Sequence, residues 1–358
     1  MRRIGRTCLK ASFALLIWLC LIYTWPVMFD TTQRATDLQS NKQEPTHHQL
    51  THPQNQRLAV SGLAQYINHS SDQLVAQYGQ PAIKSDQGNE TSHWLYYPES
   101  RQAFEATINQ LTNQVEQLVM LGNQSPISPF DYQQSLASIT QTISLAANFE
   151  VRLHEQQFQI ELTETQQKQL PLVEFKNQTY AILKMTDARL SQIIYLNANT
   201  LLQTNLYRVR SKTPTPVNDS DYSQVQASQQ SITNLQQFSQ IMRLNQQLPS
   251  LPVKPLQAQS NESVVLKSLF TKKGWQQFRR LQNQANGQYL TTRAFKLAVM
   301  GAEYGLSPQA QLFVWPNQVV LQQLTLSQQT ALTTALRRTD LQAMRIGQLA
   351  GATILVLE

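Results

Sequence analysis

Charged residues and glycine are scarce in this 358-residue chain, and the pattern of the few glycines excludes one class of function. Lysine, arginine, aspartate and glutamate together make up 14% of the sequence, and 53 glutamines replace them as the main polar residues. The 11 glycines form neither of the glycine-rich phosphate-binding patterns, so no nucleotide site is predicted. Apolar residues still reach 41% and recur along the chain, which predicts folded domains with sizeable cores.

Cysteine and histidine are missing from most of the chain. Cys8 and Cys20 are the only cysteines, so neither thiol catalysis nor a disulfide is expected beyond them. All six histidines precede residue 155, and three of them lie close together in a segment without apolar periodicity; the six are His47, His48, His52, His69, His93 and His154. A metal site needs ligands of fixed geometry. We therefore predict no metal, no cofactor and no catalytic residue.

The formal charge of +7 is a weak indication of nucleic-acid binding. Four of the positive charges precede the first apolar run, and the rest of the chain holds 25 lysines and arginines against 22 carboxylates. The clearest basic cluster combines Lys272 and Lys273 with Arg279 and Arg280, and no basic stripe with interleaved aromatics appears. We interpret this cluster as the solvated face of a helix and expect no nucleic-acid partner.

The first apolar run predicts a membrane anchor. Residues 11–29, ASFALLIWLCLIYTWPVMF, carry no charge and would span about 28 Å as a helix. Basic residues precede this run, so the positive-inside rule places the N-terminus in the cytoplasm and the following domains outside the cell. We expect a single-pass protein of the cell membrane that contacts the lipid bilayer through residues 11–29. A cleaved signal peptide and lipidation of Cys20 are the alternatives.

A flexible stalk is predicted over residues 30–60, and organised sequence begins at residue 61. Leu74, Val75 and Tyr78 share a helical face that ends at Gly79, and SHWLYYPE then has the aromatic content of a strand. The stretch over residues 100–121 favours a helix. A second unit, running from a short helix in SPFDYQQSLASITQTISL into the strands of FEVRLHEQQFQIELT, suggests an imperfect internal repeat.

The segments that follow carry a resemblance to a known family. PLVEFKNQTYAILKM and RLSQIIYLNANTLLQTNLYRVR alternate as strands around a polar turn at Asp187. Together with YGQP, WLYY and FQIELT, they resemble the CAP-associated N-terminal domain of secreted or membrane-anchored Firmicute proteins. The resemblance covers residues 61–210 and implies an α+β fold. In that family, a CAP domain usually follows; its superfamily comprises cysteine-rich secretory, antigen 5 and pathogenesis-related proteins.

A proline-containing linker over residues 211–221 separates this region from residues 222–358, which are similar to a divergent CAP domain. The resemblance implies an α-β-α sandwich and places Glu303 of MGAEYGLSPQAQLFVW on the family's glutamate. CAP domains that bind a divalent metal use two histidines. Leu336 stands where the later histidine would be, so Glu303 has no imidazole partner. We interpret Glu303 as a structural or relic group.

Aromatic residues give the remaining lead to function. Trp94, Tyr96, Tyr97, Glu303, Tyr304 and Trp315 are candidates for lining a ligand groove, although core packing is the competing explanation for the aromatic members. The sequence favours a non-catalytic binding or adaptor module of the bacterial cell envelope, with a cell-wall, lipid or protein ligand. The alternative is a cell-wall or peptide hydrolase of CAP type that uses carboxylates alone; Glu150, Glu155, Glu161 and Glu164 are close enough in sequence to suggest one.

Overall fold

The computed structural model describes most of the chain beyond residue 55. The described residues are 56–86, 90–210, 224–256, 267, 270–282, 288–296, 306, 309–317, 319–327, 330–349 and 352–358. They belong to one compact unit, Asn55–Glu358, and we call residues 56–210 the N-terminal domain and 224–358 the C-terminal domain. The predicted anchor at 11–29, the linker at 211–221, Glu303 and Tyr304 lie outside these ranges. Within them, no helix has the length and apolar character needed to cross a bilayer.

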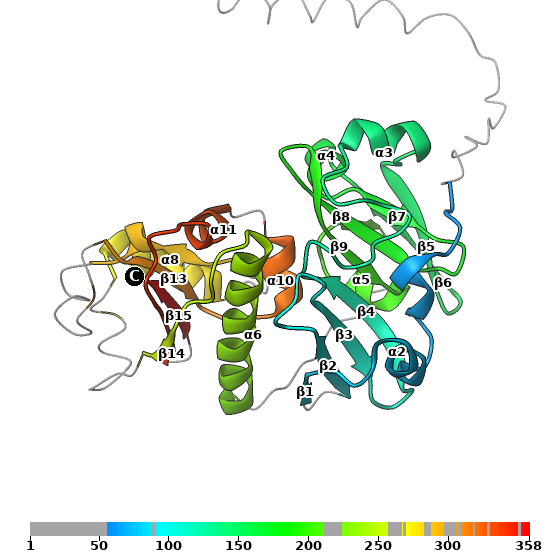
Figure 1. Cartoon of the computed structure of the whole chain (residues 1–358). Coiled ribbons are helices and arrows are strands. Elements are labelled where there is room, and N and C mark those ends of the chain that lie inside the picture. Colours follow the sequence, from blue (N-terminus) through cyan, green and yellow to red (C-terminus); the bar gives the residue numbers. More distant parts are fainter. Residues whose placement is uncertain are drawn as a thin grey trace, which may run out of the picture. The chain divides into compact units, whose positions relative to one another are not determined.

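The N-terminal domain is built on a seven-stranded antiparallel sheet (Figure 1). Alternating polar and apolar residues form the strands, and positive backbone angles at Asn113 and Asp187 allow tight turns between them. The strand order is β1 (Ile83–Asp86), β2 (Thr91–Tyr96), β3 (Phe104–Asn109), β4 (Gln114–Met120), β9 (Arg189–Leu196), β8 (Tyr180–Thr186) and β7 (Leu172–Glu174).

Each face of this sheet is covered by a different layer. One face packs on η1 (Gly62–Tyr66), α2 (Ser71–Tyr78) and α3 (Leu136–Thr142), around residues such as Leu63, Leu74 and Ile139. The other face meets a small sheet and two short helices: β10 (Arg208–Arg210), β6 (Gln156–Glu161), β5 (Asn148–Leu153), α4 (Glu164–Gln169) and α5 (Ala198–Gln203). Because β5 and β6 leave the main sheet, the two predicted units differ in their strand arrangement.

The helix predicted over residues 100–121 is wrong, because this stretch forms the β3–β4 hairpin. Glutamine and glutamate favour helices only weakly, and packing overrides that preference. In FEATIN, the apolar side chains of Phe104, Ala106 and Ile108 alternate onto one core, which is a period of two residues. The side chain of Asn109 closes the turn by accepting the amide hydrogens of Leu111 and Thr112.

Ordered chain begins before the predicted domain start at residue 61. Leu58 pairs with Phe175 beside strand β7 through two backbone hydrogen bonds of 2.9 Å. The neighbouring Arg57 side chain forms an ion pair of 2.9 Å with the buried carboxylate of Glu174. Backbone hydrogen bonds and an ion pair therefore hold the last residues of the predicted stalk against the domain.

The C-terminal domain contains a five-stranded mixed sheet with helices on both faces (Figure 1). Its strand order is β11 (Val253–Pro255), β14 (Met344–Leu349), β15 (Ala352–Leu357), β13 (Gln311–Trp315) and β12 (Leu290–Thr291). One face packs on α6 (Gln224–Asn245), α10 (Leu321–Leu326) and α11 (Thr330–Leu336), and the other on α8 (Lys272–Gln282) beside η2 (Thr292–Ala294).

A buried arginine joins the helices of this domain. Arg243, near the end of α6, is 1% exposed, and its guanidinium donates hydrogen bonds to the carbonyls of Pro249, Leu336 and Arg338. Two of these carbonyls lie at the C-terminal end of α11, where a helix dipole favours positive charge. Nothing in the local sequence around Arg243 indicates this contact.

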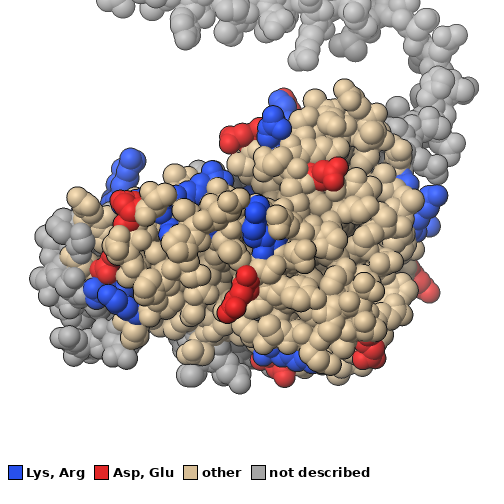
Figure 2. Space-filling view, in the orientation of Figure 1, with Lys and Arg blue, Asp and Glu red and all other residues tan. Residues whose placement is uncertain are grey.

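The two domains share one hydrophobic cluster and a polar clamp. The cluster runs from Val119 and Leu121 of the first domain to Leu235 and Phe238 of the second. Beside it, the Asn245 side chain donates to the carbonyl of Leu121 at 2.8 Å and accepts from the amide of Asn123 at 3.0 Å. On the outer surface, charged side chains are scattered among uncharged ones, as the low charge content predicts (Figure 2).

Candidate functional site

The predicted groove residues of the first domain lie mainly in its core. Strand β2 turns Trp94 and Tyr96 toward the cluster beneath α2 and α3, and Tyr96 is only 1% exposed. Tyr97 follows the strand with a φ of 49°, which turns its ring outward to 39% exposure. Trp94 donates its indole hydrogen to the Ser92 hydroxyl, and the Lys84 ammonium lies 4.0 Å from its ring centroid. Of these three aromatic rings, Tyr97 presents the largest accessible surface.

Contacts among four aromatic rings connect the YGQP and WLYY segments. Tyr96 stacks on Phe104 with ring centroids 4.7 Å apart, and Tyr78 meets Phe104 edge-on at 5.2 Å. The Tyr97 hydroxyl donates to the carbonyl of Tyr78 at 2.7 Å, which ties the end of α2 to the end of β2. Burial raises the pKa of Tyr78 and of Tyr96 to about 12. These contacts build the fold and leave only the edge of the cluster open.

The described groove candidate of the second domain, Trp315, lies in a different cluster of buried residues. Trp315 is 1% exposed and packs beside Tyr289, with ring centroids 5.0 Å apart, in the cluster under α6. Trp94 and Tyr96 belong to a different cluster, so the described aromatic candidates do not converge on one surface. The remaining two candidates, Glu303 and Tyr304, fall outside the described residues, and the predicted groove around them stays a prediction.

A row of buried polar side chains lies on the opposite face of strands β2, β3 and β4. His93, Glu105, Thr107 and Gln117 alternate with the apolar residues that face α2 and α3. Glu105 and Gln117 are each 3% exposed, and the Glu105 carboxylate lies 3.1 Å from Nδ1 of His93. The Thr107 hydroxyl is buried without a partner among the described residues. Buried polar groups are costly unless they are paired, so this row needs an explanation.

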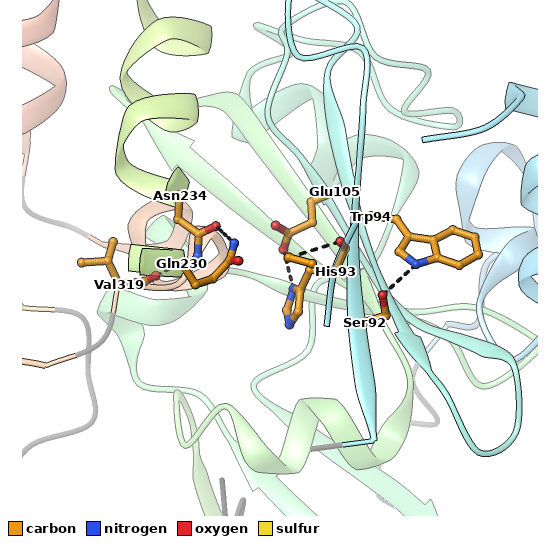
Figure 3. Close-up of polar contacts among 8 residues, drawn as sticks. Ser92, His93, Trp94, Glu105, Gln230, Asn234 and Val319 are labelled. Atoms are coloured by element: carbon orange, nitrogen blue, oxygen red, sulfur yellow. Dashed lines mark hydrogen bonds and ion pairs between the residues drawn. The ribbon is translucent and has the colours of Figure 1, made fainter. Parts of the chain in front are cut away.

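The polar row faces the side of the sheet on which helix α6 lies. Figure 3 shows His93 and Glu105 projecting from one side of the strands, toward Gln230 and Asn234 of α6, while Trp94 and Ser92 project from the other. Gln230 donates to Asn234, which in turn donates to the carbonyl of Val319 at 2.8 Å. Pairing with Glu105 occupies Nδ1 of His93, and the described residues offer Nε2 no hydrogen-bond partner. This nitrogen can bind a polar group of a ligand.

Sequence reasoning missed this row for a physical reason. A strand with polar residues at every second position has the same pattern whether its polar face meets water or another domain. His93 and Glu105 also lie 12 positions apart, and only the antiparallel register of β2 and β3 brings them together. Had β3 been recognised as a strand, a histidine and a glutamate on two neighbouring strands would have indicated the pair.

The carboxylates of the C-terminal domain offer little acid–base chemistry. Residues 222–358 contain four of them and no histidine. Asp340 accepts hydrogen bonds from the guanidinium of Arg338, which hold the pKa of its carboxyl below the usual range. The C-terminal residue Glu358 pairs with Arg345 at 3.1 Å. Leu336, which we predicted to stand at the position of the family's later histidine, is 1% exposed.

The glutamates of the first domain that suggested a paired-carboxylate hydrolase are mostly matched with cations. Glu150 pairs with Arg152 at 2.9 Å on the outer face of β5, and Glu161 pairs with Arg210 at 2.9 Å. Glu164 pairs with Lys168 one helical turn away, and the hydrogen bond from that lysine lowers the pKa of its carboxyl. These glutamates therefore lie in ion pairs at the surface of the domain.

Comparisons with known proteins agree with this architecture. Residues 67–207 match the family model described as CAP-associated N-terminal. The fold is similar to that of an extracellular protein containing an SCP domain from Bacillus anthracis, with a TM-score of 0.62 and 14% identity over 89% of this chain and 99% of that one. It is also similar to a cysteine-rich secretory protein from Staphylococcus aureus, with a TM-score of 0.64 and 12% identity over 85% and 94% of the two chains. No curated protein matches the sequence.

The family recognised in the sequence is therefore confirmed. The helices on both faces of the second sheet agree with the similarity in fold to these two bacterial structures. Residues 67–207 form a CAP-associated N-terminal domain, and the chain that continues from them has the fold of the bacterial SCP-domain proteins.

Proposed function

We propose that this protein is a membrane-anchored binding module on the outside of the bacterial cell, with no hydrolytic activity. In this proposal, residues 1–29 hold the cytoplasmic stub and the anchor, residues 30–60 are the stalk, and the two domains occupy residues 61–210 and 222–358. The two similar structures are described as extracellular and secretory proteins, which supports an external location. The charge asymmetry around residues 11–29 supports the anchor.

The observation that carries this proposal is the state of the carboxylates in the C-terminal domain. Acid–base hydrolysis by two carboxyl groups needs one of them protonated near neutral pH. Asp340 and Glu358 are each paired with an arginine, and the pKa of Asp340 is lowered, opposite to what a general acid needs. With no histidine in residues 222–358, the domain also lacks an imidazole base. Its described residues fit a structural role.

The polar row supplies a possible contact for the bound ligand. The side chain of His93 keeps 11% exposure, and Glu105 orients its ring through Nδ1. A histidine held in this way presents Nε2 in a fixed direction, which suits hydrogen bonding to a hydroxyl or amide of a cell-wall saccharide or peptide. A histidine can also activate a neighbouring serine as a nucleophile, and Ser92 precedes His93 in the sequence. The side chain of Ser92, however, projects from the other side of the strand and accepts a hydrogen bond from Trp94 (Figure 3).

Two assays on the full chain test the proposal. Purified cell-wall sacculi should retain the wild-type protein in a pull-down assay, and the protein should release no soluble fragments from sacculi or peptide substrates. The fragment-release assay is repeated with the Glu303→Gln variant, because this change removes a proton-transfer group while keeping the side-chain volume. Hydrolysis by the wild type that disappears in an equally stable Glu303→Gln variant would establish the hydrolase alternative and reject the binding module.

The role of the polar row is tested separately. Replacing both His93 and Glu105 with leucine removes the pair without leaving one buried partner alone. If the row binds the ligand, the amount of this variant retained by sacculi should be at least tenfold lower than that of the wild type. Its unfolding midpoint should stay close to the wild-type midpoint. Unchanged retention would show that the ligand contacts another surface.

A further inference from the structure

The two domains carry opposite charge. Residues 222–358 contain 12 lysines and arginines against four carboxylates, a formal balance of +8, whereas residues 61–210 contain nine against 13, a balance of −4. The moderate charge of the whole chain hides this separation. A surplus of this size on one domain creates an attractive field for anions, particularly where the cations lie close together.

Helix α8 concentrates four of these cations on one side. Lys272, Lys273, Arg279 and Arg280 are all exposed, and Gln276 and Gln277 lie between them on the same face. Gly274, Phe278 and Leu281 face the core, and Trp275 packs beside them half-buried, so the helix is amphipathic. The helix contains no acidic residue, and none of these four cations forms an ion pair within the part of the chain that the structure describes.

The basic face of α8 is held rigidly by the domain. The amide of Gly274 donates to the Thr271 hydroxyl at 3.0 Å, and a Cβ on Gly274 would lie 2.2 Å from the carbonyl oxygen of Ala294. This close approach fixes α8 against η2 and the residues after it, where Arg293 and Lys296 add two more exposed cations. Beneath the helix, Trp275 stacks on Phe278 with ring centroids 5.2 Å apart.

We propose that the exposed face of α8 binds a linear polymer of phosphodiester-linked polyol units. The two pairs of cations are seven residues apart, which is about 10 Å along a helix. A single phosphate cannot reach both pairs, whereas an extended polymer with a phosphate in every unit can. Arginine and lysine suit phosphate oxygens, and the two glutamines between them can hydrogen-bond the polyol hydroxyls.

A membrane surface fits this face less well. Helices that lie on a bilayer insert an apolar side among the acyl chains. Gly274, Phe278 and Leu281 of α8 are buried, and Trp275 is half-buried against the same core, so the exposed contact surface is mainly polar and charged. The surface is also separate from the polar row of the first domain, so the two proposals can fail independently.

Binding is measured with the full chain in phosphatidylcholine nanodiscs and a fluorescently labelled poly(glycerol phosphate). Four cation contacts predict a roughly 50-fold loss of affinity between 50 and 200 mM salt, on the dependence known for flexible polyanions. Lys272→Gln combined with Lys273→Gln leaves two contacts, so its affinity should fall at low salt and its loss over the same interval should shrink to roughly sevenfold. The Arg279→Gln, Arg280→Gln variant should show the same lower affinity and the same weaker salt dependence.

The matched control removes the same net charge elsewhere in the domain. Lys254 is exposed on β11, at the sheet edge opposite β12, and Arg337 is exposed at the end of α11, which packs in a different cluster from α8. The Lys254→Gln, Arg337→Gln variant should keep the wild-type salt dependence. Equal weakening in this control would overturn the proposal by showing a nonspecific charge effect. Stronger displacement of the polymer by phosphatidylglycerol nanodiscs at equal phosphate concentration would assign the surface to membranes. Light scattering that shows self-association, lost in the α8 variants, would assign it to the acidic domain of a second copy.

Discussion

Three charged side chains show how differently this protein accommodates burial. Arg243 gives its guanidinium hydrogens to three backbone carbonyls, and Glu174 is paired with Arg57. Desolvation raises the pKa of the Glu174 carboxyl, and the nearby Arg57 partly offsets that rise. Lys184 on β8 has no ion-pair partner among the described residues, and desolvation lowers the pKa of its ammonium to about 8. Of these three charges, we therefore expect that of Lys184 to destabilise the fold the most.

Lys184→Met should raise the free energy of unfolding at pH 7 by about 1–3 kcal/mol, because a folded-state pKa near 8 against 10.5 disfavours the charged form. The sign follows from proton uptake. Below pH 8 the ammonium is charged in both states and the burial cost is complete, whereas between pH 8 and 10.5 the unfolded chain binds more protons, so the wild type gains stability. The advantage of the variant should shrink over that range in urea unfolding at pH 7, 8, 9 and 10.

Comparing variants at each pH removes the contribution of tyrosine. Burial raises the pKa values of Tyr180, Tyr195 and Tyr207, which costs stability above pH 10 equally in both proteins. Lys176→Met, at an exposed lysine, is the matched control and should leave the unfolding midpoint unchanged. An equal gain from both substitutions would mean that added apolar area, not the desolvated charge, is the cause.

The pairing of His93 with Glu105 predicts strong coupling between them. His93→Leu alone should cost about 2–4 kcal/mol, because it leaves a carboxylate that is 3% exposed without its partner. Replacing both residues with leucine should cost less than this single change. Urea unfolding of the wild type, both single variants and the double variant measures the coupling; additive losses would show that the two side chains do not interact in solution.

At the scale of elements, local signals in the sequence predict some boundaries well and others poorly. The helix α2 ends where Gly79 adopts a φ of 78°, and the hairpin of β8 and β9 turns at Asp187, both as predicted. The hairpin of β3 and β4 was predicted as a helix, because glutamine-rich segments satisfy either period and only the packing of Phe104 and Ile108 selects the strand. The polar row escaped prediction for the same reason, since it depends on the strand register.

Contacts between elements of different domains were also beyond sequence reasoning. Asn245 ends α6 and bonds to the segment after β4, more than 120 residues away. Nothing in the local pattern of an asparagine distinguishes this role from an ordinary helix end. The α-β-α arrangement of the C-terminal domain, in contrast, followed from the resemblance, and clusters of buried residues on both faces of its sheet are consistent with it.

Asn245→Ala should destabilise the protein by about 1–3 kcal/mol, because it leaves the carbonyl of Leu121 and the amide of Asn123 without their partner. Limited proteolysis should also cut faster between residues 211 and 223 if the clamp couples the domains. Gln246→Ala is the control, since that side chain is exposed one position further on. Equal effects from the two substitutions would indicate a general loss at the end of α6.

For the whole molecule, the separation of charge bears on how the proposed anchor and the two domains act together. If the proposed stalk between residue 29 and Arg57 is flexible, its length of about 25 residues would let the domains reach on the order of 30 Å from the bilayer. The basic face of α8 would then meet anionic polymer outside the membrane, while the acidic balance of residues 61–210 disfavours contact of the polymer with the first domain. Tethering also raises the local concentration of the module near its ligand, so modest affinity at each contact suffices.

The topology can be tested directly on cells. Because residues 2–10 are basic and residues 11–29 are uncharged and apolar, we expect the protein to stay with membranes after a high-salt wash. Protease added to intact cells should remove the domains after Asp30, and an epitope tag at the N-terminus should stay protected until the membrane is permeabilised. Replacing Arg2, Arg3, Arg6 and Lys10 with glutamine should reduce insertion in this orientation without altering the folded domains. Release of a fragment that begins after residue 29 into the medium by the cell itself would instead identify a cleaved signal peptide, and the binding module would then act free of the membrane.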